Sequence, residues 1–196
     1  MGSARASDVG RVTSFSSDDG AFTFQLPAGW KISTRCSPSQ RDRCAPKVRR
    51  ESVLAYRTSG EAAALEATVD FGAFGKRLSD WASLEEVVSM LQATLPSTKL
   101  CDAVKETNKS GAQSRYYVVR FRGASSGERL VKVSVQQSRL FTLTLQTDSA
   151  PSPALREELE AIARSYQSFP VSSLRGGLLS STAPAVLTPP SLSLLR

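Results

Sequence analysis

The hydrophobic residues of this chain follow two different periods, and each period predicts a different kind of element. Apolar and polar side chains alternate in several short runs, which is typical of strands with one buried face. A glycine between the second and third runs predicts a hairpin, and the last three runs predict an antiparallel meander. The expected strands cover residues 21–26, 52–57, 64–71, 100–107, 116–122, 130–135 and 140–145.

Two other stretches have the period of an amphipathic helix. Ser83 and Glu86 have the spacing of a capping box, and an apolar stripe follows them. Ser152 and Pro153 supply a cap and a proline at the first helical position. These signals predict helices at 83–94 and 153–168. Composition predicts loops over the basic stretch 31–51 and the glycine-containing stretch 72–82.

Together these elements predict an α+β fold, in which an antiparallel β-sheet of about six strands is sandwiched by α-helices. A chain of 196 residues suits one domain with tails. We expect an extended N-terminal arm at 1–17, a folded domain at 18–171 and an irregular C-terminal tail at 172–196. The tail is rich in Ser, Leu, Pro and Gly and contains no acidic residue.

The net charge of +7 is unevenly distributed. Between positions 35 and 50 stand six basic residues and a single acid, Asp42. This segment is either a solvated loop or a docking patch for an acidic surface. Nucleic acid is a third possible partner, but no aromatic residues are interleaved and no nucleic-acid-binding motif surrounds the segment. The candidate partner-binding residues are Arg35, Arg41, Arg43, Lys47, Arg49 and Arg50.

The chain contains no histidine, which removes the commonest general base and the commonest transition-metal ligand. A serine–histidine–aspartate triad is therefore impossible, and no phosphate-binding loop of the Gly-x-x-x-x-Gly-Lys kind is present. We expect a protein that is not an enzyme and that binds no cofactor directly. Whether it binds a metal is left open.

Three cysteines are present, and their surroundings differ. Cys36 and Cys44 bracket a short polar stretch that could close as a disulfide in an oxidising compartment, although spacing alone does not establish the required geometry. Cys101 stands in an apolar context, so we expect it to be a small buried residue with a free thiol.

The order of several short motifs resembles the PsbP family, the extrinsic lumenal subunits of photosystem II and their paralogues. Family members open with a strand of the form Gly-x-Phe-x-Phe-x-x-Pro-x-x-Trp. They continue with a helix that begins Ser-x-Glu-Glu and with a Tyr-Tyr strand, and they close with a helix that ends near Ser-Phe. The resemblance spans about residues 17–171, and the residues that carry it are Gly20, Phe22, Phe24, Pro27, Trp30, Ser83, Glu85, Glu86, Tyr116, Tyr117, Ser168 and Phe169.

The resemblance implies a non-catalytic protein of the chloroplast thylakoid lumen, peripheral to the thylakoid membrane. Its partners would be membrane subunits of a photosystem and other extrinsic subunits. The best-known family member stabilises the oxygen-evolving complex and helps it to retain calcium and chloride. By this resemblance the basic segment would meet acidic lumenal surfaces, and salt would weaken the attraction.

Two alternatives remain open within the same family. The protein could be an assembly factor that binds transiently, or a lineage-specific subunit of another thylakoid complex such as photosystem I. Some family members carry histidines implicated in metal binding, and these have no counterpart here. The Cys36–Cys44 stretch and the tail after Val171 are also not features of the family.

Overall fold

The computed structural model of the chain describes residues 12–17, 20–36, 50–72, 75, 77–95, 97–107 and 115–169. In these ranges it has ten strands and three helices. In chain order they are β1 (Thr13–Ser16), β2 (Phe22–Leu26), β3 (Trp30–Cys36), β4 (Arg50–Arg57), β5 (Ala63–Phe71), α1 (Leu78–Trp81), α2 (Leu84–Thr94), β6 (Thr98–Thr107), β7 (Arg115–Gly123), β8 (Glu128–Gln136), β9 (Arg139–Thr147), α3 (Pro153–Ser165) and β10 (Gln167–Ser168).

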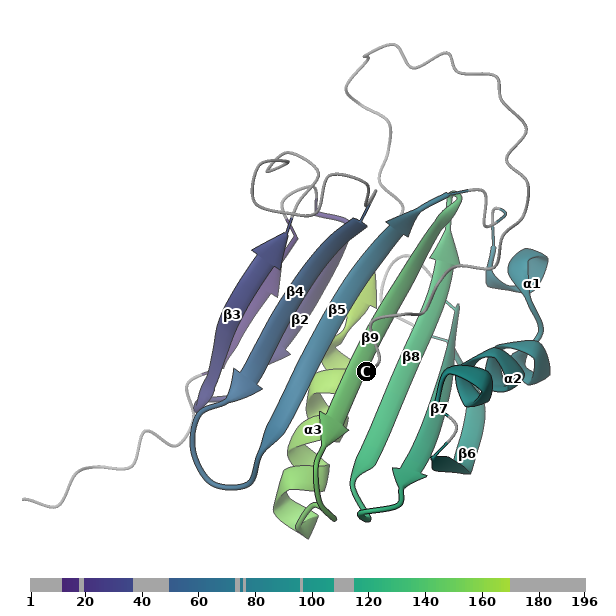
Figure 1. Cartoon of the computed structure of the whole chain (residues 1–196). Coiled ribbons are helices and arrows are strands. Elements are labelled where there is room, and N and C mark those ends of the chain that lie inside the picture. Colours follow the sequence, from purple (N-terminus) through teal and green to yellow (C-terminus); the bar gives the residue numbers. More distant parts are fainter. Residues whose placement is uncertain are drawn as a thin grey trace, which may run out of the picture.

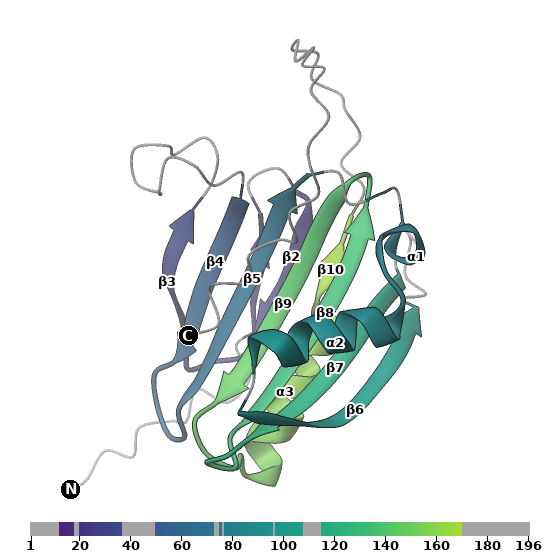
Figure 2. The same ribbon diagram turned by 45° about the vertical axis from the view of Figure 1, so that its right-hand side comes forward.

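The main sheet has seven antiparallel strands in the order β3-β4-β5-β9-β8-β7-β6, with β3 and β6 at its edges (Figure 1). Helix α3 and a small sheet, β1-β2-β10, lie against one face. Helix α2 crosses the other face over β7 and β8 (Figure 2). The predicted α+β class is confirmed. Six of the seven predicted strands lie in the main sheet, which also contains the unpredicted strand β3. The predicted strand at 21–26 corresponds to β2 of the small sheet, which was not predicted as a separate sheet. None of the helices in the described ranges is long and apolar enough to cross a membrane.

The two faces of the main sheet bury two separate hydrophobic clusters. Tyr116 and Val118 on β7 belong to the cluster under α3 and the small sheet. Tyr117, Val119 and Phe121 on the same strand belong to the cluster under α1 and α2. Because successive side chains of a strand point to opposite faces, β7 is buried on both sides. The dense apolar sequence of this strand follows from that position.

The capping interactions that the sequence predicts at the starts of α2 and α3 are present in the structure. The Ser83 backbone N–H donates to Glu86 Oε2 at 2.7 Å, and the Glu86 N–H donates to Ser83 Oγ at 3.2 Å, so the capping box is confirmed. Ser152 Oγ caps α3 by accepting from the Leu155 N–H at 3.2 Å. These bonds satisfy backbone N–H groups that a first helical turn leaves without partners.

Several predicted boundaries were wrong. The expected loop 31–51 contains all but the first residue of β3, in which Trp30 and Ile32 are half-buried against the core while Lys31 and Ser33 are exposed. The many basic residues that follow hid this alternation. Strand β1 lies within the expected arm 1–17 and pairs with β2.

Two more corrections concern the helices. The expected loop 72–82 contains α1, which forms because Leu78 is buried in the second cluster. The second long helix ends at Ser165 rather than at residue 168, because Gln167 and Ser168 pair with β2 as the short strand β10.

Candidate functional site

The structure places the two described ends of the predicted basic segment side by side. Arg35 lies next to the last residue of β3, and Arg50 is the first residue of the neighbouring antiparallel strand β4. Both therefore stand at one end of the main sheet, which we call the basic end. Four of the predicted partner-binding residues lie outside the described ranges: Arg41, Arg43, Lys47 and Arg49.

The register brings three more arginines to the basic end, which the sequence reasoning missed. Arg115 begins β7 and Arg139 begins β9, while Arg77 forms a β-bridge with Gln136 at the end of β8. Arg77 and Arg115 are exposed, and Arg139 is half-buried. The signal was available in part, because alternate strands of the predicted meander must begin at the same end of a sheet.

The predicted disulfide between Cys36 and Cys44 stays a prediction, because Cys44 lies outside the described residues. Thiol titration of the unreduced, denatured protein tests it. A single reactive thiol would support the bridge, whereas reaction of all three cysteines would refute it.

Cys101 is exposed, so the prediction that it is buried was wrong. The pairing of β6 with β7 shifts register between Leu100 and Asp102, which makes Cys101 an extra residue in a bulge of an edge strand. Among the described strands, none pairs with the other side of β6. The apolar neighbours in sequence gave no sign of the bulge.

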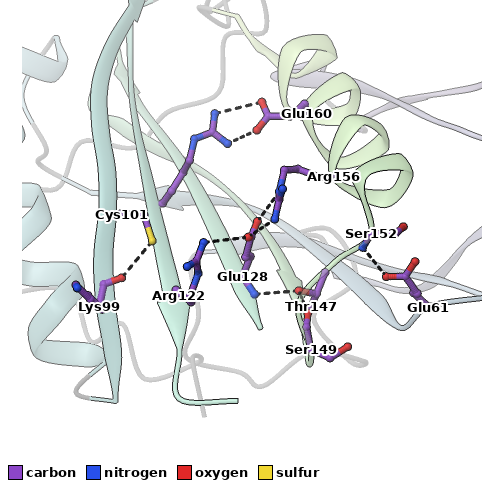
Figure 3. A network of polar contacts seen from close by, with 11 residues as sticks. Glu61, Lys99, Cys101, Arg122, Glu128, Thr147, Ser149, Ser152, Arg156 and Glu160 are labelled. Atoms are coloured by element: carbon purple, nitrogen blue, oxygen red, sulfur yellow. Dashed lines mark hydrogen bonds and ion pairs between the residues drawn. The ribbon is translucent and has the colours of Figure 1, made fainter. Parts of the chain in front are cut away.

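A cluster of charged side chains joins α3 to the main sheet at the end opposite the basic end (Figure 3). Arg156 on α3 forms two hydrogen bonds with the Glu128 carboxylate, at 2.6 and 3.2 Å. Arg120 on β7 forms a second two-pronged pair with Glu160, with 3.2 Å between Nη2 and Oε2. Arg122 Nη2 lies 3.7 Å from Glu128 Oε1. Two-pronged pairs of this kind are stronger and more directional than single ion pairs.

These pairs surround a cavity of about 210 Å³ that Cys101 also lines. Hydrogen bonds to Glu160 raise the pKa of Arg120, and hydrogen bonds to Glu128 raise the pKa of Arg156. Each guanidinium is therefore already matched with a carboxylate of the same chain. The cluster is best explained as a set of contacts that orient α3 on the sheet.

A buried lysine under α3 is the most unusual polar residue of the described chain. Lys132 is 3% exposed, and its Nζ donates to the Ala163 carbonyl at 2.9 Å near the end of α3. The same Nζ lies 3.3 Å from Glu106 Oε2 and 4.4 Å from the centre of the Tyr116 ring. Burial lowers the pKa of Lys132, and the Glu106 carboxylate opposes that shift.

The contacts of Lys132 continue into β10. The Ser168 N–H donates to the Tyr116 hydroxyl oxygen at 2.9 Å, and Gln136 Nε2 donates to the Ser168 carbonyl at 3.0 Å. Sequence reasoning missed this group, because a lysine between two valines on a strand normally points to solvent. The contacts of this group stabilise the end of α3 and the turn that leads into β10.

In the described ranges, no group of three or more His, Cys, Asp or Glu residues could hold a metal ion. The charged groups of the cluster that joins α3 to the sheet, and those around Lys132, are engaged with each other. Their arrangement supports attachment of structural elements, whereas the basic end gathers arginines from several strands.

Comparisons with known proteins identify the family to which this chain belongs. A search of curated proteins found no match. The solution structure of cyanobacterial PsbP (CyanoP) from Synechocystis sp. PCC 6803 superposes with a TM-score of 0.61 at 16% identity, covering 86% of this chain and 99% of that one. A crystal structure from Bacteroides thetaiotaomicron VPI-5482 matches with a TM-score of 0.44 at 11% identity, covering 80% of this chain and 48% of that one. The sequence profile of PsbP matches residues 10–168, so the chain belongs to the PsbP family.

Proposed function

We propose that this protein is a non-catalytic extrinsic subunit on the lumenal side of a photosystem. There it would stabilise the oxygen-evolving complex of photosystem II and its retention of calcium and chloride. The observation that carries the proposal is the family match over residues 10–168. The absence of histidine from the sequence is consistent with a role that requires no acid–base catalysis.

The basic end is the proposed attachment surface. The net charge is +7, and the strand register gathers Arg35, Arg50, Arg77, Arg115 and Arg139 at one end of the sheet. Exposed ion pairs contribute only about 0–1 kcal/mol each, so several must act together. Attachment of this kind is steered by charge and weakens as salt screens it.

The experiment is to isolate pigment–protein complexes from thylakoid membranes at low salt and to quantify this chain in each. The proposal predicts stoichiometric amounts in mature photosystem II and release by a salt wash. Recovery only with assembly intermediates would point to an assembly factor instead. Recovery with photosystem I would assign the protein to another complex. Either result would overturn the proposed role at the oxygen-evolving complex.

A further inference from the structure

Residues of α1, α2 and their connection line a shallow groove. The two helices lie on the face of the main sheet opposite α3 (Figure 2). The volume of the groove is about 510 Å³. The residues that line it are Trp81, Ala82, Glu85, Glu86, Ser89 and Met90.

The floor of the groove is apolar and held in place. Trp81 and Met90 are half-buried, and both pack against the second hydrophobic cluster with the rest of their surface turned outward. The Tyr117 hydroxyl donates to the Ala82 carbonyl at 3.1 Å, which ties the connection between α1 and α2 to β7. A partner would therefore meet a preformed apolar surface, which lowers the entropic cost of binding.

The rim of the groove is acidic. Glu85 and Glu86 are exposed in the first turn of α2. Hydrogen bonds with Ser83 lower the pKa of Glu86, so its carboxylate is ionised at neutral pH. Burial raises the pKa of Tyr117, whose hydroxyl lies beneath the connection between the helices, and the charges of Glu85 and Glu86 raise it further.

The layer formed by α1 and α2 carries a charge opposite in sign to that of the whole molecule. Residues 78–98 contain three acids, Asp80, Glu85 and Glu86, and no lysine or arginine, in a chain with a net charge of +7. Charge complementarity therefore favours a basic partner on this layer, whereas the basic end favours an acidic one. Lysine and arginine also bind well beside an aromatic ring.

We propose that the groove binds a basic segment of a partner protein. Lysine or arginine side chains of that segment would meet Glu85 and Glu86, and an apolar side chain would pack on Trp81 and Met90. None of the residues that line the groove belongs to the basic end, although Arg77 of that end directly precedes α1. This proposal does not depend on where the basic end attaches.

The test is an NMR titration of the ¹⁵N-labelled full chain with two synthetic peptides. One peptide is composed of lysine and leucine, and the other has glutamate in place of every lysine. We expect the basic peptide to shift the amide signals of residues 78–94 and the acidic peptide to leave them unchanged. Equal binding of both peptides, or shifts confined to other elements, would overturn the proposal.

Variants establish that the groove itself binds. Glu85→Gln should weaken binding of the basic peptide about two- to fivefold, the range expected for one exposed ion pair. Met90→Gln should weaken it as well, because it removes apolar contact surface. Glu157→Gln, at an exposed position on α3, removes the same charge elsewhere and should have no effect. Wild-type affinity in Glu85→Gln and Met90→Gln would contradict the proposal.

A second copy of this chain is the competing occupant, because its own basic segment could fill the groove. Dilution of the labelled protein without peptide distinguishes the two. If the signals of residues 78–94 change with protein concentration, the groove serves self-association and the proposal is wrong. If they do not change, the groove is available to a different protein, as proposed.

Discussion

At the scale of single residues, close approach of backbones limits what the fold tolerates. Gly127 shows this most clearly, because a Cβ at this position would lie 2.3 Å from the Thr147 carbonyl oxygen. Gly123, in the same turn region between β7 and β8, has more room, since its nearest neighbour would be the Gly127 carbonyl oxygen at 3.6 Å. The two glycines therefore form a matched pair for a stability measurement.

We predict that Gly127→Ala lowers the free energy of unfolding by about 1–3 kcal/mol, because backbone rather than a flexible side chain must move. Gly123→Ala should cost less than about 1 kcal/mol. Urea unfolding of both variants and the wild type measures the difference. Equal costs would show that the approach of β8 to Thr147 is not as tight as described.

Lys132 permits a prediction for pH. Burial lowers the pKa of Lys132 in the folded protein. At pH values between this lowered pKa and the ordinary pKa of lysine, the unfolded chain therefore binds more protons than the folded one. The stability that Lys132 contributes must then rise with pH across this range. We predict that the stability of the wild type relative to Lys132→Met increases as pH rises toward about 10. A difference that is flat or falls over this range would contradict the buried position.

At the scale of elements, charged side chains of α3 fix the helix to the main sheet on more than one side. The Trp30 indole N–H donates to Glu158 Oε1, and Arg57 donates to both oxygens of the same carboxylate at 3.2 and 3.3 Å. Glu158 therefore links β3 and β4 to α3. Its neighbour Glu157 is exposed on the same helix.

We predict that Glu158→Ala lowers the free energy of unfolding by about 1–3 kcal/mol, because it leaves partly buried donors without an acceptor. Glu157→Ala makes the same chemical change in the same helix and should alter stability by less than about 0.5 kcal/mol. Thermal or urea unfolding gives both values. If the two substitutions cost the same, the link through Glu158 does not stabilise the fold.

Local signals allowed prediction of some elements and not of others. The sequence patterns predicted the start of α2, the β4–β5 hairpin and the β7–β9 meander, because these features depend on residues that are close together in the chain. The type of the turn between β8 and β9 could not be predicted, because Gln137 and Ser138 adopt positive φ values of 49° and 62° without the usual Asn-Gly. Such values fit a type I′ turn. Strand β3 was missed because charge obscured a short alternation.

At the scale of the whole molecule, the long-range pairing of β5 with β9 decides the architecture. It joins Ala63 to Thr147 across the sequence and places the hairpin beside the meander in one sheet. No local pattern specifies that neighbour, so neither the strand order nor the grouping of arginines at the basic end could be derived completely from the sequence. The same pairing leaves β3 and β6 as the two edges.

The consequence is a molecule with distinct charged surfaces. The basic end gathers arginines of β3, β4, β7 and β9, whereas the layer formed by α1 and α2 contains acids and no lysine or arginine between residues 78 and 98. On our proposal, the basic end attaches the protein to an acidic lumenal surface. A matched pair of charge variants tests this claim, because both lower the net charge by the same amount.

The first variant combines Arg77→Ser and Arg115→Ser, two exposed positions at the basic end. The control combines Lys31→Ser and Lys99→Ser, two exposed positions near the opposite end of the sheet. Each protein is rebound to salt-washed thylakoid membranes over a range of ionic strength. We predict that the first variant binds more weakly and with a smaller salt dependence, while the control binds like the wild type. Equal binding of all three proteins at every ionic strength, or equal loss in both variants, would contradict attachment through the basic end.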